Sequence, residues 1–576
     1  MARHATARHC AAALIMALAG TALAQSPLQR DTSFGPVVGA EDASGGTWSW
    51  KGVPFAKPPV GELRWRAPVD PQPWTAPRPA QAFGPACASS GRLYGPGRNN
   101  RYDATIGESL DQTVGSEDCL YLNIWRPAAP AQGPLPVIVF VHGGSNITGY
   151  TADPVYDGAT LARTANAVVV TVNYRLGVLG FFASPALRSG DPAQDSGNFA
   201  LLDIIKALQF VQRNIGRFGG DAGRVTLMGE SAGAVNVYAL LTSPLVAQTR
   251  PALFHRAVAM SGGISRPEDL PPGRFPVLVA PSLFEAQARL LLSHRLAADG
   301  LTQDVATAEG YIARHKPAEL AAYLRGLKVD DVLSTVLTHL KAANLGASNP
   351  IADGHVVARS PIDAIKSGNY LKVPVLAGNT RDEGKLFPQL LALAPGLGGV
   401  SGRLMTDRQV FDIAARYDPD APPQTRIEDW VPKAYLPTDA PGTGYDARMT
   451  VLGEYWFVPL RDNVLGALKG KQDDVWYYRF DWAQEPAPFD RIFGAAHAFD
   501  LPFVFGNFGP SVWSRVMFSR ANEPGRLALA EAMMKSLGAF ARDGDPNHAL
   551  LGTAWPRWPA TLRFDATAKE RVITAH

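Results

Sequence analysis

Residues 229–233 read Gly-Glu-Ser-Ala-Gly and separate a short apolar run, 225–228, from a helix-like run, 234–241. A strand, a tight turn and a helix in this order would place Ser231 at the turn, in a strained conformation that exposes its hydroxyl. Glycines two residues before and after Ser231 suit such a turn, because strand and helix nearly touch there. The amide of Ala232 would then point to where an oxyanion forms. The pattern predicts a nucleophilic serine, although an ordinary glycine-rich turn also fits these five residues.

Apolar runs elsewhere in the chain alternate with helix-like segments. The run 137–141 is Val-Ile-Val-Phe-Val, and the run 167–172 is similar. Neither alternates between apolar and polar residues, which is typical of strands covered on both faces. The segment 199–215 has the periodicity of an amphipathic helix. Strands alternating with helices predict an α/β fold, with a central, mostly parallel sheet flanked by helices. Further strands are expected at 121–125, 225–228, 256–260, 373–377 and 475–480, with short strands and turns at 31–80.

Two long helical insertions are expected between the sheet elements, at about 265–345 and 385–470. In the first, apolar residues between 320 and 327 recur at helical spacing, and Pro317 suits the first turn of a helix. One interpretation is that this stripe packs on the body of the protein. Another is that both insertions roof the serine and select the substrate, and the two are compatible. Because no linker or internal repeat divides the chain, residues 25–576 are expected to form a single domain.

The first 24 residues have the features of a secretory signal peptide. Arg3 and Arg8 form a basic start, residues 11–18 form a short apolar stretch, and residues 22–24 read Ala-Leu-Ala. This arrangement predicts cleavage before Gln25 and export to the periplasm or the medium. The apolar stretch is too short to span a bilayer, which disfavours an N-terminal membrane anchor.

The composition suits a large globular protein. The 576 residues are 46% hydrophobic and 19% charged, with a formal net charge of +3. This balance gives no indication of a nucleic-acid partner or an anionic membrane surface. No other segment has an apolar run long enough for a membrane span. Cys87 and Cys119 follow the signal segment, and two cysteines in an exported protein indicate a disulfide rather than metal ligands.

Several motifs occur in order along the chain. Residues 116–123 read Ser-Glu-Asp-Cys-Leu-Tyr-Leu-Asn, 173–175 read Asn-Tyr-Arg, 218–221 read Phe-Gly-Gly-Asp, and 352–354 read Ala-Asp-Gly. With the serine turn, this set resembles the type-B carboxylesterases, the cholinesterase-like branch of the α/β-hydrolases, over about residues 31–565. The resemblance implies an α/β-hydrolase fold and a serine carboxylic-ester hydrolase. It also implies an acyl-enzyme intermediate, a small-molecule ester substrate and no metal or organic cofactor.

The resemblance also assigns the partners of the serine. In this family a glutamate and then a histidine follow the nucleophile. Glu383, within Asn-Thr-Arg-Asp-Glu-Gly at 379–384, matches the acid. Asp382 and Glu383 would point in different directions from the end of the strand, so only one of them can face the histidine. His497 matches the base, which takes the proton of Ser231 while Glu383 stabilises the imidazolium. A solvated carboxylate and a structural histidine are the alternatives.

The oxyanion loop is matched by His-Gly-Gly-Ser-Asn at 142–146, directly after the expected strand 137–141. Carried over by position, the amides of Gly144, Ser145 and Ala232 hold the oxyanion. Ser145 replaces the usual third glycine, so its side chain occupies space beside the acyl pocket or adds a hydrogen bond. Glu230, beside the nucleophile, is expected either to order water and the pocket or simply to pack.

Three other functions fit parts of the pattern. A non-catalytic binding protein of this fold is disfavoured by the presence of Ser231, Glu383 and His497. A true cholinesterase is disfavoured because residues 88–118 contain no tryptophan for a cation–π site of the usual kind. An amidase that uses the same triad is the third alternative. The oligomeric state and the preferred acyl and alcohol groups are left open.

Overall fold

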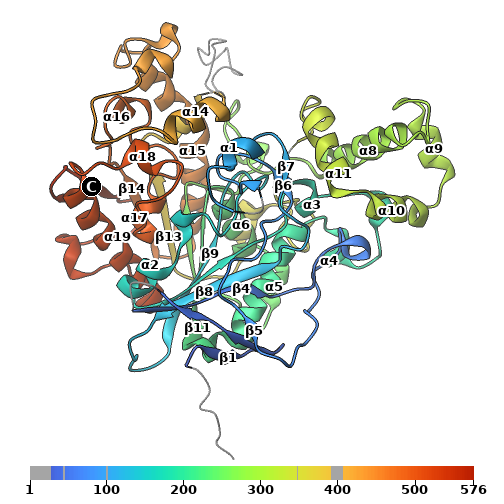
Figure 1. Cartoon of the computed structure of the whole chain (residues 1–576), viewed down its shortest axis with the longest axis horizontal. Helices are drawn as coiled ribbons and strands as arrows, with labels where there is room; N and C mark the ends of the chain where they lie inside the picture. Colours follow the sequence, from blue (N-terminus) through green and yellow to red (C-terminus); the bar gives the residue numbers. More distant parts are fainter. Residues whose placement is uncertain (1–26, 43–45, 99–100, 347, 389, 391–405) are drawn as a thin grey trace, which may run out of the picture.

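The computed structural model of the chain describes residues 27–42, 46–98, 101–346, 348–388, 390 and 406–576. The segment 1–24, expected to be a signal peptide, lies outside these described residues. Eleven strands of the described chain pair into one sheet, in the order β16-β15-β14-β13-β12-β11-β9-β10-β8-β4-β3 (Figure 1). They are β3 (Ala40–Glu41), β4 (Thr47–Pro54), β8 (Tyr121–Pro127), β9 (Leu135–Val141), β10 (Val168–Val172), β11 (Gly220–Glu230), β12 (Arg256–Met260), β13 (Val375–Thr380), β14 (Val475–Phe480), β15 (Leu562–Ala566) and β16 (Arg571–Ala575).

The middle of this sheet is parallel and its edges are antiparallel. Neighbouring strands from β10 through β9, β11, β12, β13 and β14 to β15 are parallel. The pairs β10–β8, β8–β4, β4–β3 and β15–β16 are antiparallel. Every residue of β9 and β10 is buried, in agreement with their unbroken apolar runs. The predicted mostly parallel sheet is therefore confirmed, and the C-terminal strands β15 and β16 add an edge that the sequence patterns did not predict.

The helices cover both faces of the sheet. Val139, Leu227 and Ala257 point into a core shared with α5 and α6, whereas the next residues along each strand point into a second core shared with α2, α17 and α19. This alternation follows from the two-residue period of a strand. The helices of the described chain are α1 (Ile106–Ser109), α2 (Ala159–Ala165), α3 (Gly177–Gly180), α4 (Pro192–Asp195), α5 (Phe199–Asn214), α6 (Ala232–Leu241), α7 (Pro244–Gln248), α8 (Pro281–Ala298), α9 (Ala308–Arg314), α10 (Pro317–Gly326), α11 (Val329–Thr335), α12 (Pro361–Ser367), α14 (Asp407–Ala414), α15 (Tyr445–Lys469), α16 (Phe489–Ile492), α17 (Leu501–Phe505), α18 (Ser514–Met517) and α19 (Glu523–Asp543).

The carboxyl ends of the parallel strands meet at one edge of the sheet. Val141, the last residue of β9, pairs with Gly229 of β11, and Met260, the last residue of β12, pairs with Glu230. The turn with the expected nucleophile follows β11, and the segment with the expected acid follows β13. Segments far apart in the sequence therefore leave the sheet side by side, which is where ligands bind in open α/β sheets.

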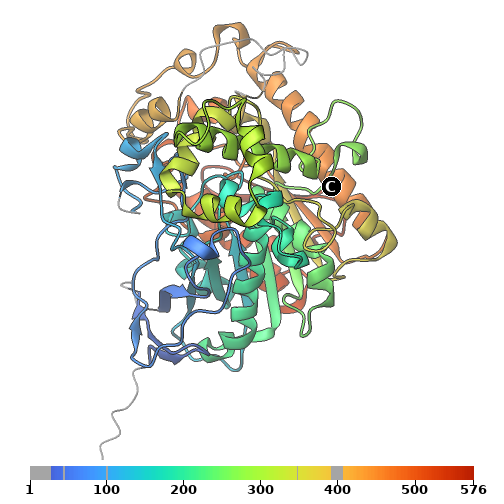
Figure 2. The same cartoon turned by 90° about the vertical axis from the view of Figure 1, so that its right-hand side faces the viewer.

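Helices occupy both segments that were expected to be insertions. The first contains α8 to α11 and forms an arm at the right of Figure 1, which faces the viewer in Figure 2. Its apolar stripe packs on the body, because Leu320 and Leu324 of α10 belong to the same core as the strand residues. The second contains α14 and α15, at the upper left of Figure 1. Residues 389 and 391–405 of this segment lie outside the described chain.

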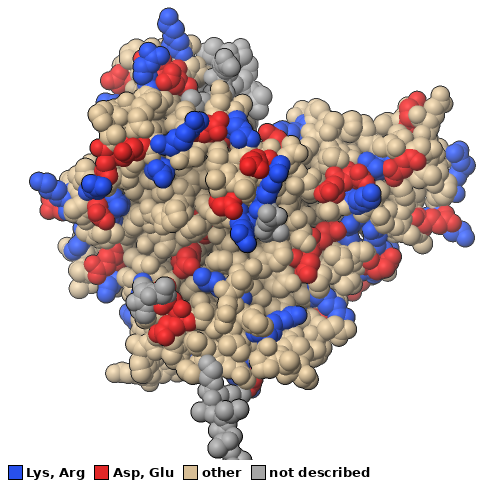
Figure 3. Space-filling view, in the orientation of Figure 1, with Lys and Arg blue, Asp and Glu red and all other residues tan. Residues whose placement is uncertain are grey.

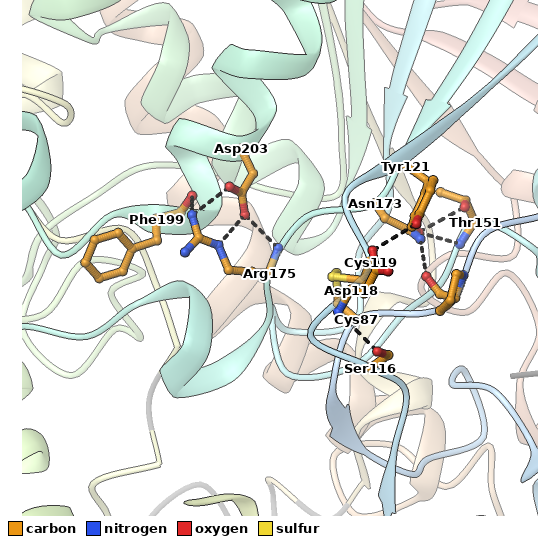
Figure 4. The surroundings of a disulfide bond; sticks show 11 residues. Cys87, Ser116, Asp118, Cys119, Tyr121, Thr151, Asn173, Arg175, Phe199 and Asp203 are labelled. Atoms are coloured by element: carbon orange, nitrogen blue, oxygen red, sulfur yellow. Dashed lines mark hydrogen bonds and ion pairs between the residues drawn. A yellow bond between two sulfur atoms is a disulfide. The ribbon is translucent and has the colours of Figure 1, made fainter. Parts of the chain in front are cut away.

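Cys87 and Cys119 form a disulfide, with their Cα atoms 4.9 Å apart (Figure 4). The predicted bridge is therefore present, and it closes a loop whose ends are 32 residues apart. By loop-closure entropy such a bridge contributes about 2–4 kcal/mol. Nearby, the hydroxyl of Tyr121 donates to Asp118 at 2.9 Å, and the amide nitrogen of Asn173 donates to the carbonyl of Pro85 at 3.0 Å. The motifs at 116–123 and 173–175 also meet beside the bridge, because the backbone nitrogen of Asn173 donates to the carbonyl of Tyr121 at 3.1 Å.

Short strands lie outside the main sheet. Strands β1 (Gln29–Asp31), β2 (Pro36–Val38) and β5 (Arg78–Pro79) form a small sheet, and β6 (Ser89–Ser90) pairs with β7 (Thr113–Val114). On the face drawn in Figure 3, acidic and basic side chains are interspersed. None of the described helices combines the length and the apolar character that a bilayer span requires.

Candidate active site

Ser231 occupies a strained turn between β11 and α6, with φ 55° and ψ −122°. The turn is held by the backbone amide of Ser231, which donates to the carbonyl of Met260 at 2.8 Å. A Cβ on Gly233 would lie 2.1 Å from the carbonyl oxygen of Val141, and one on Gly229 would lie 2.4 Å from the backbone of Gly233. Only glycine fits at either position, as the sequence analysis expected for a strand and a helix in close contact.

The carboxylate of Glu383 contacts the imidazole of His497 across 114 residues of sequence. Oε2 of Glu383 lies 2.6 Å from Nδ1 of His497, and both side chains are buried. Oε1 accepts hydrogen bonds from the Ser261 hydroxyl at 2.7 Å, the Asn379 amide at 2.8 Å and the Thr380 backbone nitrogen at 3.1 Å. Burial alone would raise the pKa of Glu383, but the interaction with His497 and these donors holds it below the usual range. Glu383 therefore stays ionised in a fixed orientation.

Asp382 points away from the imidazole although it is the neighbour of Glu383 in sequence. Its Oδ2 accepts from the guanidinium of Arg381 at 2.6 Å and from the backbone nitrogen of Ala495 at 3.0 Å. The backbone nitrogen of Asp382 donates to the carbonyl of Ala495 at 2.9 Å. Asp382 thus binds the backbone of the loop that carries His497, while Glu383 binds its ring.

The other nitrogen of His497 faces Glu230. Nε2 lies 3.1 Å from Oε1 of Glu230, and neither atom has a hydrogen-bond partner in the part of the chain that the structure describes. Burial raises the pKa of Glu230 to about 8. Burial would lower the pKa of His497, but the carboxylates of Glu230 and Glu383 outweigh it and raise this pKa to about 9. Ser231 and His497 line the same cavity without being hydrogen-bonded to each other.

Three consecutive residues of the loop after β9 have positive φ: Gly144 at 91°, Ser145 at 55° and Asn146 at 56°. Such a conformation is costly for residues other than glycine and persists only where the surroundings impose it. Here Oδ1 of Asn146 accepts from the amide of Asn236 at 2.9 Å and from the hydroxyl of Tyr174 at 3.1 Å. The buried side chain of Asn146 therefore anchors the loop that the sequence analysis assigned to oxyanion binding.

The backbone amides of this loop are available to a ligand. Among the turn and loop hydrogen bonds of the described residues, the amides of Gly144 and Ser145 donate to no protein acceptor. Ala232 is the first residue of α6, where a backbone N–H has no partner within the helix. Ser145, Ser231 and Ala232 line one cavity, so the first and last of these amides belong to the wall around the serine.

Two neighbouring cavities share Ser231 in their walls. The larger, about 330 Å³, is also lined by His497 and Glu230. The smaller, about 280 Å³, is also lined by Ala232 and Val235, but not by His497. The two insertions supply other wall residues, including Phe387 and Trp456 from the second and Pro276 and Val277 from the first.

The second insertion also packs directly against the imidazole. The rings of Phe387 and Phe457 each lie 5.0 Å from the ring of His497. These contacts cover His497 with apolar groups and separate it from bulk water. The second insertion therefore covers the site beside His497, in agreement with the interpretation that the insertions roof the serine.

Several residues of the site were not predicted. Ser261 and Asn379, which orient Glu383, come one and two residues after the expected strands 256–260 and 373–377, and this position was the available signal. Asp500, fully buried, accepts from the hydroxyl of Tyr478 at 2.7 Å, and burial raises its pKa to about 6. Within the described residues no group of three or more His, Cys, Asp or Glu side chains is arranged to hold a metal ion.

The chain is similar to known esterases over nearly its full length. A family model described as the carboxylesterase family matches residues 26–572. Identity to the fumonisin B1 esterase of Sphingopyxis macrogoltabida is 34% over 535 residues, which cover 92% of this chain and 84% of that protein. Identity to the para-nitrobenzyl esterase of Bacillus subtilis (strain 168) is 30% over 533 residues, or 92% of this chain and 91% of that protein. A solved carboxylesterase of Geobacillus stearothermophilus matches with a TM-score of 0.67 and 29% identity, covering 95% of this chain and 98% of the other.

Proposed function

This chain belongs to the carboxylesterase family and is an ester hydrolase, and from that premise we propose that it works through an acyl-enzyme formed on Ser231. Glu383 orients His497, which acts first as the general base and then as the general acid. The amides of Gly144, Ser145 and Ala232 hold the oxyanion.

The contact between Glu383 and His497 carries this proposal. A carboxylate 2.6 Å from Nδ1 fixes the tautomer in which Nε2 is free to accept a proton. That ring lines the same cavity as Ser231, whose strained turn exposes a hydroxyl. Catalytic hydrogen bonds are often long before substrate binds, so the approach of Nε2 to Ser231 is expected to tighten in the complex.

In the first half of the reaction, Oγ of Ser231 attacks the ester carbonyl and its proton passes to Nε2 of His497. The negative charge that develops on the carbonyl oxygen is held by the three backbone amides, in a cavity from which apolar side chains exclude water. Glu383 stabilises the imidazolium that forms. The imidazolium then protonates the leaving alkoxide, and the alcohol departs.

In the second half, water enters the space that the alcohol has left and attacks the acyl carbonyl. His497 accepts the proton of this water and returns it to Oγ of Ser231 as the tetrahedral intermediate collapses. The carboxylic acid leaves, and the serine is regenerated. The water supplies the one proton that the departing alcohol has taken, so the protons balance over the cycle.

Reaction with an ester-like phosphonate tests the assignment of the nucleophile. We expect a p-nitrophenyl alkylphosphonate to inactivate the protein with one equivalent bound, and peptide mass spectrometry to find the adduct on Ser231. A panel of p-nitrophenyl esters of rising acyl chain length should be hydrolysed by untreated protein and not by labelled protein. An adduct on another residue, or activity that survives complete labelling, would contradict the proposal.

The pH dependence should reflect the two carboxylates around His497. Only the neutral imidazole can accept the serine proton, and the negative charges of Glu230 and Glu383 keep the proton on His497 to a higher pH than the usual histidine value of 6.5. We therefore expect kcat/KM for a neutral ester to rise between pH 7 and pH 9. In Glu230→Gln one negative charge is lost, so this rise should shift to lower pH. A rise centred at or below pH 6.5 in the wild type, or one that Glu230→Gln does not move, would contradict this.

We also propose that residues 25–576 act as one catalytic domain outside the cytoplasm, after residues 1–24 are removed. The disulfide between Cys87 and Cys119 supports this, because such bonds persist in oxidising compartments. The exported protein should begin at Gln25 on N-terminal sequencing. A mature protein that retains Met1 would refute it.

A further inference from the structure

A buried carboxylate in the wall of the larger cavity has no part in the mechanism above. Asp153 lies on the loop after the oxyanion segment, and its side chain is 6% exposed. It lines the same cavity as Ser231 and His497. One of its oxygens accepts from the backbone nitrogen of Val155 at 3.0 Å, which starts a short 3₁₀ turn at 154–156.

No positive charge of the described chain compensates Asp153. It is in no ion pair among these residues. Burial raises its pKa to about 7, although the hydrogen bond from Val155 acts to lower this pKa. The other acids of this wall differ, because Glu230 faces His497 at 3.1 Å and Asp407 pairs with Arg92 at 2.5 Å. Burial of an uncompensated carboxylate is unfavourable, and in a cavity it marks a position where a ligand can supply the missing charge.

Several tyrosines lie near this carboxylate. The backbone of Asp153 is hydrogen-bonded to Tyr150 at 3.2 Å and to Tyr156 at 2.9 Å, and its charge contributes to the raised pKa values of Tyr102, Tyr150 and Tyr156. Tyr156 itself lines the cavity. An ammonium ion is stabilised both by a carboxylate and by the faces of aromatic rings, and such contacts are strongest where water is excluded. This combination suits an organic cation better than a neutral or anionic group.

The position of His497 indicates which part of an ester reaches Asp153. The imidazolium must protonate the leaving alkoxide, so the alcohol portion lies in the cavity that contains His497. The smaller cavity, lined by Ala232 and Val235 but not by His497, is left for the acyl portion. Asp153 therefore belongs to the alcohol side of the site.

We propose that Asp153 and the tyrosines around it form a binding site for a positively charged nitrogen in the alcohol portion of the substrate. The inference rests on the proposed ester hydrolysis at Ser231. Its construction differs from the tryptophan-based cation site that the sequence disfavoured, because the charge comes from a buried carboxylate on another loop. The enzyme should therefore prefer esters of amino alcohols or quaternary ammonium alcohols to uncharged esters of the same shape.

Matched pairs of butyrate esters test this preference. In each pair the alcohol chain, two to five carbons long, ends in a trimethylammonium group or in the isosteric, uncharged tert-butyl group. At pH 8 we expect kcat/KM for the best cationic ester to exceed that of its neutral partner by about tenfold, the effect of one desolvated cation contact. An ester that carries a carboxylate at the same place should be the poorest substrate.

Two variants test whether the preference for cationic esters depends on Asp153. Asp153→Asn removes the charge but keeps an oxygen that can accept from Val155, and it should lower the cation-to-neutral ratio to near one. Asp157→Asn is the matched control: Asp157 accepts from Ala159 at 2.9 Å on the same segment, pairs with Lys51 and is not part of the cavity wall. It should leave the ratio unchanged.

The outcomes separate this inference from the proposed function. Hydrolysis of the neutral esters with no preference for the cationic ones, a preference for the anionic ester, or a ratio that Asp153→Asn does not change would overturn the cation site alone. Hydrolysis of none of the esters would overturn both. If Asp153→Asn does not fold, competition decides the matter: butyltrimethylammonium should inhibit wild-type hydrolysis of a neutral ester at least about tenfold more strongly than its isostere 2,2-dimethylhexane.

Discussion

Replacing Ser231 by alanine should lower kcat for a p-nitrophenyl ester by about 10⁵-fold or more, to the level set by the oxyanion amides and substrate binding alone. Alanine keeps the Cβ and the backbone amide that donates to Met260, and it removes only the oxygen that bonds to the acyl group. The loss should appear in kcat, because no acyl-enzyme can form. Pre-steady-state kinetics with the ester in excess should show a burst of p-nitrophenol in the wild type, about one equivalent per site, that the variant lacks.

The matched control for this variant is Ser334→Ala in α11, which removes an exposed hydroxyl that lines neither cavity. Its activity should equal that of the wild type. Thermal unfolding of Ser231→Ala should stay within a few degrees of the wild type, since the turn is held by backbone contacts and by glycine packing. Folded Ser231→Ala protein that retains more than about a hundredth of wild-type kcat would refute a role for Ser231 as the nucleophile.

Replacing Glu383 by glutamine should lower kcat by about 10⁴-fold while leaving the fold in place. Oε1 of Glu383 already accepts from Ser261, Asn379 and Thr380. Because the amide oxygen of glutamine would keep those three donors, its NH₂ group would face Nδ1 of His497. The amide would then donate where the carboxylate accepts, which fixes the wrong tautomer of the imidazole and places a proton on Nε2.

The neighbouring Asp382→Asn provides the control for this change. Asp382 binds Arg381 and the backbone of Ala495, so its replacement disturbs the loop of His497 without changing the charge that faces the ring. We expect a loss of at most about tenfold, as for one displaced hydrogen bond. A larger loss in Asp382→Asn than in Glu383→Gln, measured on folded protein, would show that the acid of the triad had been assigned to the wrong residue.

Much of the fold was predictable because its signals are local. The unbroken apolar runs of β9 and β10 indicated strands that are covered on both faces, and the structure buries every residue of both. Strands β12 and β14 have the predicted bounds, 256–260 and 475–480. The C-terminal pair β15 and β16 was not predicted, since it carries polar residues on its outer face and forms an edge only through pairing with β14.

The residues of the site were also predictable only in part. Glycines at 229 and 233 indicated the turn of Ser231, because close approach of two backbones leaves no other choice of residue. The family motif selected Glu383 over Asp382, and the structure puts the carboxylate of Glu383 on the imidazole. Glu230 was expected only to order the pocket or to pack, whereas the structure places it 3.1 Å from Nε2. That contact depends on how the loop of His497 lies over the end of β11. A short sequence motif does not predict the relative position of two such distant segments.

The sequence by itself determined most of the strands, the turn at Ser231 between two glycines, and the family. Hydrophobic periodicity and steric demands act between residues that are close in the chain. Only the tertiary structure decided which buried charges have partners. Glu383 contacts His497, which is 114 residues away in sequence. Asp153 lies in the cavity wall, and none of the described residues forms an ion pair with it. Electrostatic energies in a dry interior depend on distances of a few ångströms between groups that folding brings together, and such distances exist only once the sheet and its insertions have packed.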